Sequence, residues 1–346
     1  MSPKSISIKD IARAVGMSHS TVSRALSDSP LVAKDTKRRI QRVAHEMGYV
    51  PSAIARGLVT KRTRTIGLVV TTITDPFIGE VVQGVEERAM DADYSVILCD
   101  CNAEPERELA NVRVLREKRV DAIIVTSSRV GNLYVPLLED LDVPIVLINN
   151  QQAGEYVYSV RSDDHQGGRL VGEYLASLGH RRIAYITGPP NASRSLVRLE
   201  GCRSALREHG LDIDPQASVP GDGRTEGGEA AVARLLQLSP HPTAIFCYND
   251  MTAIGALRAL KKAGLDVPGD VSVIGYDDIP FSAYVAPPLT TVAQPKNRLG
   301  QRAMELTLRL LEGEEGNAEE QGEELSDIVL TPAFIERASS GPAPSS

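Results

Sequence analysis

The chain has 346 residues, more than one ordinary domain holds, so we expect a small head and a larger body. No apolar run reaches the roughly 20 residues of a membrane span, and residues 1–7 show no apolar signal segment, so we expect a cytoplasmic protein with no membrane partner. The four cysteines lack paired CxxC spacing beside histidines, which predicts reduced, buried thiols and neither a metal site nor a cofactor.

Charge is divided unevenly along the chain. Residues 1–65 hold thirteen basic and four acidic side chains, a net charge of +9. Because the whole chain carries −7, the remainder must carry −16. Such asymmetry is expected when one end of a protein meets phosphate and the rest stays in solution. It makes the amino-terminal head the candidate for binding nucleic acid.

The first predicted elements are two short helices joined by a turn at Gly16, in KDIARAVGMSHSTVSRAL at 9–26. Apolar residues recur at helical spacing on both: Ile8, Ile11, Ala12 and Val15, then Val22, Ala25 and Leu26. The second helix leaves short polar and cationic groups outward: His19, Ser20, Ser23 and Arg24. A recognition helix presents such groups to base edges in the major groove. The pattern predicts a helix-turn-helix, with an ordinary helical pair as the alternative.

A third helix is predicted, with an apolar face of Ile40, Val43, Ala44 and Met47. It completes a three-helix DNA-binding domain over 1–50. A hinge and linker follow over 51–64, where Pro51 suits the first turn of a helix ending near Leu58. So short a helix is marginal alone, so we expect it to form only with a partner copy and DNA. Leu58 either wedges between base steps in the minor groove or packs on Ile54.

Over 65–337 the sequence alternates β-rich apolar runs with amphipathic stretches. The first series is 66–70, 79–92, 95–98, 106–117, 122–125 and 145–148. The second is 168–177, 183–186, 199–209, 227–238, 244–246, 252–263 and 271–274. Repeats of strand, helix and strand predict parallel sheets, so the expected fold class is α/β with two doubly wound lobes. A ligand cleft is expected between the lobes, outside the carboxyl ends of the strands.

Polar side chains that follow the predicted strands, or lie near a helix start, are candidates for holding a small molecule in that cleft. They are Asp75, Asn149 or Asn150, Arg198, Asn249, Asp250 and Asp277. Carboxylates and amides form paired hydrogen bonds with hydroxyls, and arginine supplies a planar fork, which is typical of sugar sites. Two acids have structural alternatives, because Asp250 could cap the next helix and Asp278 could order its turn. No phosphate loop, HExxH or GxSxG motif is present, so we predict no catalytic residue and no enzyme.

Three segments, in this order and spacing, resemble the LacI/GalR family of bacterial transcription regulators: IKDIARAVGMSHSTVSRAL at 8–26, GYVPSAIARGL at 48–58 and TRTIGLVVTTITDPF at 63–77. The resemblance extends over about 7–337. It implies a helix-turn-helix head, a hinge helix, and an effector-binding and dimerisation core of periplasmic-binding-protein type. One departure is Ala33, where the family usually has a serine or threonine helix cap. The third helix is therefore expected to fray or to begin slightly later.

The resemblance also implies roles for single residues. It places His19, Ser20 and Arg24 at base-reading positions, and Leu58 as the hinge leucine inserted at the centre of a palindromic operator. The full set of expected DNA contacts is His19, Ser20, Thr21, Ser23, Arg24, Ala53 and Leu58. In the core it places Arg198, Asn249, Asp277 and Gln294 at effector contacts and Phe77 at a wall of the pocket. The full set of expected effector contacts is Asp75, Phe77, Asn149, Arg198, Arg224, Asn249, Asp277 and Gln294.

The effector is weakly specified by the sequence. Tryptophan is absent, and two of the four phenylalanines, Phe77 and Phe281, are expected near the cleft. Relatives place an aromatic residue after the position of Gly221-Asp222, where this chain has Gly223 and Arg224. The arginine either favours a smaller or anionic ligand or points to solvent. The segment 275–300 is similar to ribose-type repressors of the family, which makes a pentose or its derivative the first expectation.

The carboxy-terminal part carries the remaining expectations. The acidic stretch 312–324 is predicted to be a solvated loop, and 338–346 a flexible tail without the apolar heptads of a helical bundle. A homodimer then matches a palindromic operator in double-stranded DNA. We predict a ligand-responsive regulator, most simply a repressor of carbohydrate-use genes. The alternative is a solute-binding protein of the same two-lobed form without DNA function.

Overall fold

The structure is a computed structural model that describes residues 6–49, 62–128, 130, 143–150, 158–190, 192–313 and 327–344. The predicted hinge helix at 51–58 and residues 314–324 of the acidic stretch lie outside these residues. The chain divides into two compact units. The first, called the head here, comprises Met1–Thr65 with Arg119–Asp121, and the second, called the body, comprises Ile66–Lys118 with Ala122–Ser346.

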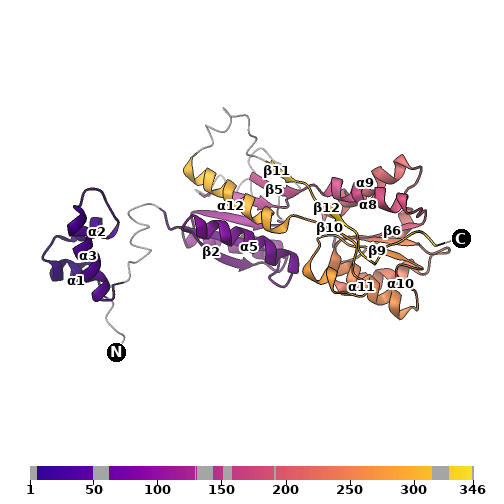
Figure 1. The fold of residues 1–346 in the computed structure, drawn as a ribbon, viewed down its shortest axis with the longest axis horizontal. Helices are drawn as coiled ribbons and strands as arrows, with labels where there is room; N and C mark the ends of the chain where they lie inside the picture. The colour runs from indigo at the N-terminus through magenta and orange to yellow at the C-terminus, as the bar shows by residue number, and fades with distance from the viewer. Residues whose placement is uncertain are drawn as a thin grey trace. The chain divides into compact units, whose positions relative to one another are not determined.

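The described part of the head contains the three predicted helices (Figure 1). They are α1 (Ile8–Val15), α2 (His19–Leu26) and α3 (Lys34–Glu46). Gly16 ends α1 with φ at 68°, in the left-handed region that glycine adopts without steric cost. Apolar side chains from all three helices are buried together: Ile11, Ala12, Val15, Val22, Ala25, Ile40 and Ala44. The predicted helix-turn-helix head is confirmed.

The starts of α2 and α3 differ in their capping. The Ser18 hydroxyl accepts a hydrogen bond from the Thr21 amide at 3.1 Å and so caps α2. Ala33 precedes α3 in an extended conformation and offers no side-chain cap. Helix α3 nevertheless begins at Lys34, directly after Ala33, so the expectation of a later start is wrong.

The missing cap gives a stability prediction. We expect Ala33→Ser to stabilise α3 by about 1 kcal/mol, because the hydroxyl can accept one of the unpaired amide hydrogens of the first turn. Amide hydrogen exchange in α3 of the full chain measures this as slower exchange. Ser18→Ala is the matched opposite change and should speed exchange in α2 by a similar free energy. Unchanged protection of α3 in Ala33→Ser would contradict the prediction.

The first lobe of the body is built on a sheet of strand order β11-β5-β4-β3-β1-β2. The strands are β1 (Thr65–Val70), β2 (Ser95–Asp100), β3 (Ala122–Thr126), β4 (Ile145–Ile148), β5 (Tyr158–Ser162) and β11 (Asp327–Leu330). All of these except β2 have parallel neighbours whose register is defined. Its helices are α5 (Pro76–Asp91), α6 (Pro105–Glu117) and α12 (Lys296–Glu312).

Helices cover both faces of this sheet. Helices α5 and α12 lie side by side on one face, where Val81 and Leu299 join the core beneath Leu68 (Figure 1). Their backbones approach closely at Gly84, where an added Cβ atom would clash with the carbonyl oxygen of Asn297. On the other face, the side chain of Leu115 in α6 occupies the space above Gly67. The first lobe is therefore doubly wound.

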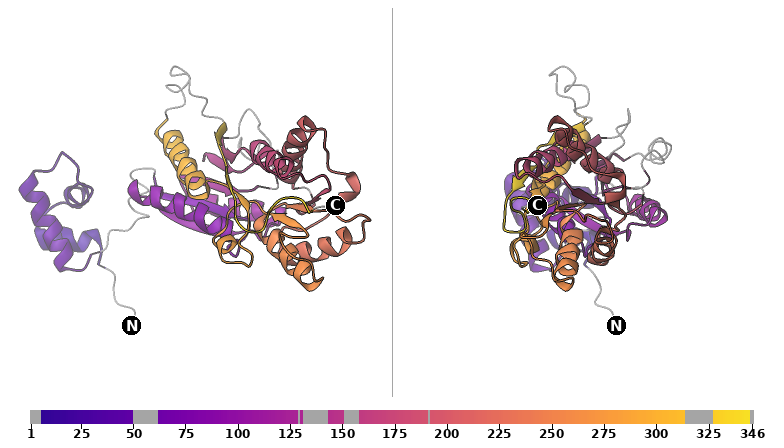
Figure 2. Two further views of the ribbon diagram at one scale, coloured as in Figure 1. Left: turned by 45° about the vertical axis from the view of Figure 1, so that its right-hand side comes forward. Right: turned by 90° about the vertical axis from the view of Figure 1, so that its right-hand side faces the viewer.

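The second lobe has a smaller sheet of order β7-β6-β8-β9. Its strands are β6 (Ile183–Ile186), β7 (Ser218–Val219), β8 (Ala244–Cys247) and β9 (Ser272–Ile274). Its helices are α8 (Asp164–Ser177), α9 (Ser193–Glu208), α10 (Thr225–Leu235) and α11 (Asp250–Lys262), with short 3-10 turns at η2 (Pro215–Ala217) and η3 (Pro280–Ala283). Helices α8 and α9 cover one face and α10 and α11 the other (Figure 2). The predicted pair of doubly wound lobes is confirmed.

The order of the two predicted series suggests that the chain completes one lobe before it begins the other. The structure differs from this expectation. After the second lobe, α12 and β11 return to the first, and β11 pairs with β5. The antiparallel pair β10 (Thr291–Ala293) and β12 (Ala333–Ile335) flanks this return. The sequence patterns do not predict α12, β5, β7, β10, β11 or β12.

The carboxy-terminal segment is packed, so the prediction of a flexible tail over 338–346 is wrong for its described part. Ser339 is fully buried, and its hydroxyl donates to the Val273 carbonyl and accepts from the Thr290 amide. The carbonyl of Gly341 accepts a hydrogen bond from Nε2 of the buried His180. Small residues permit this close backbone packing, and neither length nor composition revealed it.

Candidate functional site

The outward face of α2 forms the first candidate site. Residues His19, Ser20 and Arg24 are exposed, and Thr21 and Ser23 are partly buried. The Ser18 hydroxyl lies 2.9 Å from that of Ser20 and 2.8 Å from that of Thr21, so the start of α2 is internally ordered. Arg24 forms none of the ion pairs found among the described residues. A polar face at the start of α2, followed by a cation in its last turn, suits contact with base edges and phosphates.

Two further predicted DNA contacts, Ala53 and Leu58, lie outside the described residues. Nearby cations on α3 extend the basic character of the head. Arg38, Arg39 and Arg42 are exposed, while Lys37 forms an ion pair with Asp28 at 2.7 Å.

The second candidate site is a cavity of about 1110 Å³ in the body, lined by residues from both lobes. The first lobe contributes Thr71, Thr72, Thr74, Asp75, Asn102, Ser127, Ser128, Asn149 and Asn150. The second contributes Pro189, Ser193, Arg194, Asp222, Arg224, Thr225, Glu226 and Tyr248. Loops after parallel strands supply most of these side chains, as expected for an α/β cleft. The lining is rich in hydroxyl, amide and charged groups, which suits a polar ligand.

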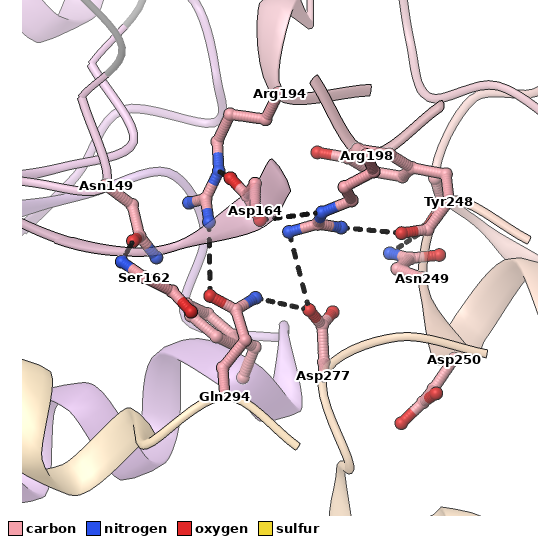
Figure 3. Close-up of polar contacts among 12 residues, drawn as sticks. Asn149, Ser162, Asp164, Arg194, Arg198, Tyr248, Asn249, Asp250, Asp277 and Gln294 are labelled. Carbon is pink, nitrogen blue, oxygen red and sulfur yellow. Dashed lines mark hydrogen bonds and ion pairs between the residues drawn. The ribbon is translucent and has the colours of Figure 1, made fainter. Parts of the chain in front are cut away.

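The structure brings some of the predicted effector contacts to this cavity and places others elsewhere. Asp75, Asn149 and Arg224 line it. Phe77 is buried in the core of the first lobe, so its predicted place at a pocket wall is not seen, and the exposed Phe281 is not among the lining residues either. Four predicted contacts form or adjoin a polar network behind the lining: Arg198, Asn249, Asp277 and Gln294 (Figure 3).

Asp164, at the start of α8, is the centre of that network. One carboxylate oxygen accepts from Nε of Arg194 at 2.7 Å and the other from Nε of Arg198 at 2.9 Å. Both arginines lie on α9, four residues apart, and therefore share one face of that helix. Burial alone would raise the pKa of Asp164, but the two guanidinium groups outweigh it and lower that pKa to about 2. Asp164 is therefore a buried carboxylate.

Arg198 is fully engaged within the protein. Its Nη1 donates to the carbonyl of Tyr248 at 2.6 Å, and its guanidinium carbon lies 3.7 Å from the centre of the Tyr276 ring. Its Nη2 lies 3.9 Å from Asp277, whose carboxylate accepts from the Gln294 amide at 2.7 Å. Burial raises the pKa of Asp277 to about 7. In this arrangement Arg198, which is 2% exposed, orders the residues behind the cavity.

The residues around the start of α11 have clear structural roles. The Asn249 side-chain oxygen caps α11 by accepting from the Thr252 amide at 2.9 Å, and its nitrogen donates to the Gly223 carbonyl. The alternative that Asp250 caps this helix is therefore wrong. The Asp250 carboxylate is fully buried and accepts from the Ile279 amide and the Ser282 and Thr291 hydroxyls. Burial raises its pKa to about 6.

The alternative that Asp278 orders its turn stays a prediction, because its side chain binds a residue from a later segment. The Asp278 carboxylate pairs with Arg337 at 2.7 Å, and its carbonyl accepts from Lys296. Arg194 and Tyr248, which line the cavity, and Asp164, which pairs with Arg194, were not predicted from the sequence. The spacing of Arg194 and Arg198 on one helix was the available signal.

Two further findings concern metal binding and membrane-spanning helices. Among the described residues, no group of three or more histidine, cysteine, aspartate or glutamate side chains is arranged to hold a metal ion. No helix in the described part of the chain has the length and apolar character needed to cross a membrane.

Comparison with known proteins decides the family. Residues 7–52 match the family model of bacterial regulatory proteins of the lacI family, and residues 173–340 match that of a periplasmic binding protein-like domain. The HTH-type transcriptional repressor PurR of Haemophilus influenzae (strain PittEE) is 37% identical over 336 residues, covering 96% of this chain and 98% of the relative. The chain belongs to the LacI family. It is therefore a ligand-responsive, DNA-binding transcription regulator.

Two other LacI-family members match over nearly their full length. The ribose operon repressor of Escherichia coli (strain K12) is 35% identical over 333 residues, covering 96% of this chain and 99% of the relative. The crystal structure of the lac repressor dimer bound to operator and the anti-inducer ONPF superimposes with a TM-score of 0.86 at 27% identity, covering 98% of this chain and 100% of that chain. These relatives are transcription repressors.

Proposed function

We propose that this LacI-family regulator is a homodimeric repressor that binds a palindromic operator and responds to a sugar or sugar derivative held in the body cavity. The chain combines an exposed polar α2 with a cavity lined by hydroxyl, amide and charged groups. This combination is the main support for the proposal. The relatives support it, because one represses a ribose operon and another is a dimer on its operator. The protein acts in the cytoplasm, where the DNA lies, and catalyses no reaction.

The proposed roles follow the placement of the residues. His19, Ser20, Thr21, Ser23 and Arg24 contact DNA through α2, with Ala53 and Leu58 acting in the hinge. Asp75, Asn149 and Arg224 contact the effector, together with the lining residues Arg194 and Tyr248. Arg198, Asn249, Asp277 and Gln294 position these groups through the network around Asp164, and Phe77 supports the Asp75 loop from the core.

Binding of the full-length protein to genomic fragments tests the proposal. We expect the protein to retain a small set of fragments that contain an inverted repeat. We also expect a mixture of small carbohydrates to change that retention. Equal affinity for all fragments would contradict sequence-specific regulation and would favour the solute-binding alternative if sugars still bind. Specific retention that no carbohydrate alters would contradict the proposed effector class alone.

A carboxylate in the head unit holds the end of the linker. Oδ1 of Asp121 accepts from the Thr63 amide at 2.7 Å and Oδ2 accepts from the Arg64 amide at 2.9 Å. The Thr63 hydroxyl donates to the same carboxylate at 2.8 Å. These residues directly precede β1 and β3, which pair in parallel and whose following loops line the cavity. The chain thus connects this contact to the cavity through two short paired strands.

Asp121→Ala is expected to weaken the coupling between effector and operator. Without effector, the variant should bind operator with an affinity within about threefold of wild type, because the base-reading face is untouched. The factor by which effector changes operator affinity should be at least about tenfold smaller in the variant than in wild type. Fluorescence anisotropy with labelled operator, with and without effector, measures both affinities. Asp214→Ala, which removes a carboxylate that orders an exposed turn of the body, is the control. Full coupling in Asp121→Ala would contradict the assignment.

A further inference from the structure

Two cavities in the body share part of their lining. A smaller cavity of about 240 Å³ lies against the larger one, and Asn149, Asn150 and Arg194 line both. The smaller cavity is otherwise lined by Ser159, Arg161, Ser162, Asp163, Asp164, His165, Val197 and Asp327. Among the described residues, these three are therefore the ones that a bound molecule could contact from either cavity.

Asn149 presents an unpaired hydrogen-bond donor at this place. The residue follows β4 with φ at 58°, a left-handed conformation that asparagine tolerates better than most residues. Its side-chain oxygen accepts from the Ser162 amide at 3.1 Å, which fixes the orientation of the amide group. The side chain is 2% exposed, and its Nδ2 has no partner among the described residues. A buried amide nitrogen left unpaired is costly, so an acceptor is expected there.

Arg194 presents a second donor to the same gap. Its Nε donates to Asp164 at 2.7 Å and its Nη2 to the Gln294 side-chain oxygen at 3.1 Å. Its Nη1 has no hydrogen-bond partner in the described part of the chain, although the residue is only 9% exposed. Figure 3 shows that this nitrogen lies on the side of the guanidinium that faces the Asn149 amide. Two fixed donors thus face one gap.

The charges behind this gap favour an anion over a neutral acceptor. Asp164 is shared by Arg194 and Arg198, so one buried carboxylate serves two buried guanidinium groups. Of the other nearby carboxylates, Asp327 pairs with Arg161 and Asp163 caps the start of α8. Asp277 is engaged by Gln294 and lies 3.9 Å from Arg198. Burial raises the pKa of Asp277 to about 7, which disfavours its charged form and weakens its compensation of the guanidinium charge. A buried excess of positive charge is costly unless an anion compensates it.

We propose that the effector is a hydroxylated small molecule carrying an anionic group, a carboxylate or a phosphate, and that Arg194 and Asn149 bind that group. This inference rests on the proposed function and names the chemical class of its ligand. The threonine hydroxyls and the carboxylates of Asp75, Asp222 and Glu226, which line the larger cavity, supply partners for the hydroxyl groups. Arg224 adds a second cationic side chain to that cavity.

Calorimetric titration of the full-length protein tests the proposal with matched ligands. The panel pairs D-ribose with D-ribonate and D-ribose 5-phosphate, and D-glucose with D-gluconate and D-glucose 6-phosphate. We expect at least one anion to bind at least about tenfold more tightly than its neutral partner, because a charge-assisted hydrogen bond is stronger than a neutral one. The carboxylates and the phosphates of the panel distinguish the two sources of charge. The preference should shrink as salt is raised.

Two variants test the assigned residues. Asn149→Asp keeps the oxygen that accepts from Ser162 but replaces the free donor with a negative charge, so the ratio of anion to neutral affinity should fall at least about tenfold. Arg194→Met should lower that ratio similarly, whereas Arg194→Lys should restore part of it through charge alone. Arg207→Met, on an exposed face of the same helix α9, is the control and should keep the wild-type ratio. Thermal melting verifies that each variant is folded.

The possible outcomes distinguish failure of the anion proposal from failure of the proposed function. If neutral sugars bind as tightly as every anion, or if Asn149→Asp leaves the ratio unchanged, the anion proposal is overturned while the proposed function stands. If no member of the panel binds and none alters operator retention, both the anion proposal and the sugar-effector function are contradicted. A salt-sensitive anion preference that Asn149→Asp abolishes and Arg194→Lys partly restores supports the assignment.

Discussion

Asp164→Asn should lower the free energy of unfolding of the body by about 3–5 kcal/mol. The substitution conserves shape but removes the carboxylate that pairs with Arg194 at 2.7 Å and with Arg198 at 2.9 Å. Breaking a buried ion pair by removing one partner leaves uncompensated buried charge, which is the physical reason for the large cost. An asparagine side chain has one acceptor oxygen, so it can bind only one of the two guanidinium groups. Its NH2 group then faces the other guanidinium and cannot accept a hydrogen bond from it. Urea unfolding of the full chain, followed by circular dichroism, measures the effect.

Asp212→Asn is the matched control for Asp164→Asn. Asp212 also pairs with two arginines of α9, Arg203 at 2.7 Å and Arg207 at 3.4 Å, but these groups are substantially exposed. Exposed pairs contribute about 0–1 kcal/mol, so the control should be nearly neutral. Equal costs for the two substitutions would show that burial does not amplify the Asp164 interactions.

The same network predicts a dependence of stability on pH. The pKa of Asp164 falls from its ordinary 3.8 to about 2 in the folded protein, because the attraction of Arg194 and Arg198 exceeds the effect of burial. A depressed folded-state pKa stabilises the protein above the unfolded-state value and loses that contribution as pH falls. The stability difference between wild type and Asp164→Asn should therefore be full above about pH 4 and decline toward pH 2. A difference that grows on acidification would contradict this assignment.

Arg24→Ala should weaken specific operator binding by about 1–3 kcal/mol, or roughly fivefold to 150-fold at fixed salt. Arg24 lies in the last turn of α2, is exposed, and forms none of the ion pairs found in the described chain. Its guanidinium is therefore available to a base edge in the groove. Because the core of the head does not include Arg24, the variant should remain folded. Anisotropy titrations with specific and scrambled duplexes separate lost base reading from lost charge.

Arg207→Ala removes the same charge from the body and serves as the control for Arg24→Ala. It should leave operator affinity unchanged, whereas Arg24→Ala should lower the ratio of specific to non-specific affinity. If Arg24→Ala weakens both duplexes equally, Arg24 contacts phosphate and does not read bases. Unchanged specific affinity in a folded variant would exclude Arg24 from the interface.

Local sequence determined the elements whose signals are short in range. The helical spacing of Ile11, Val15 and Val22 and the turn at Gly16 predict the helix-turn-helix before any tertiary contact is known. The buried apolar runs at 66–70 and 183–186 likewise predict central strands of parallel sheets. In both cases the residues that specify the element also fill its core. Periodicity therefore carries the information.

Elements that depend on distant partners gave no such signal. Strand β5 reads YSVRS and lies between β4 and β11, where Arg161 forms an ion pair with Asp327 from much later in the chain. The last residues also look like a polar tail, yet Ser339 is fully buried because it pairs with Val273 and Thr290. Composition cannot reveal a hydrogen bond whose partner is 49 residues away along the chain.

The residues of the candidate site also fall into those that local sequence predicts and those that depend on distant partners. The positions of polar residues after strands were sufficient to predict Asp75 and Asn149 at the cavity, since parallel strands end at a common edge. Only the tertiary structure showed that Arg198 is engaged by Asp164 and Tyr248, that Phe77 is in the core, and that Arg194 faces the ligand space. Sequence spacing fixes which end of a strand or face of a helix a residue occupies. Both neighbouring arginines pair with Asp164, and which of them also lines the cavity depends on the further groups that surround each one, which only packing decides.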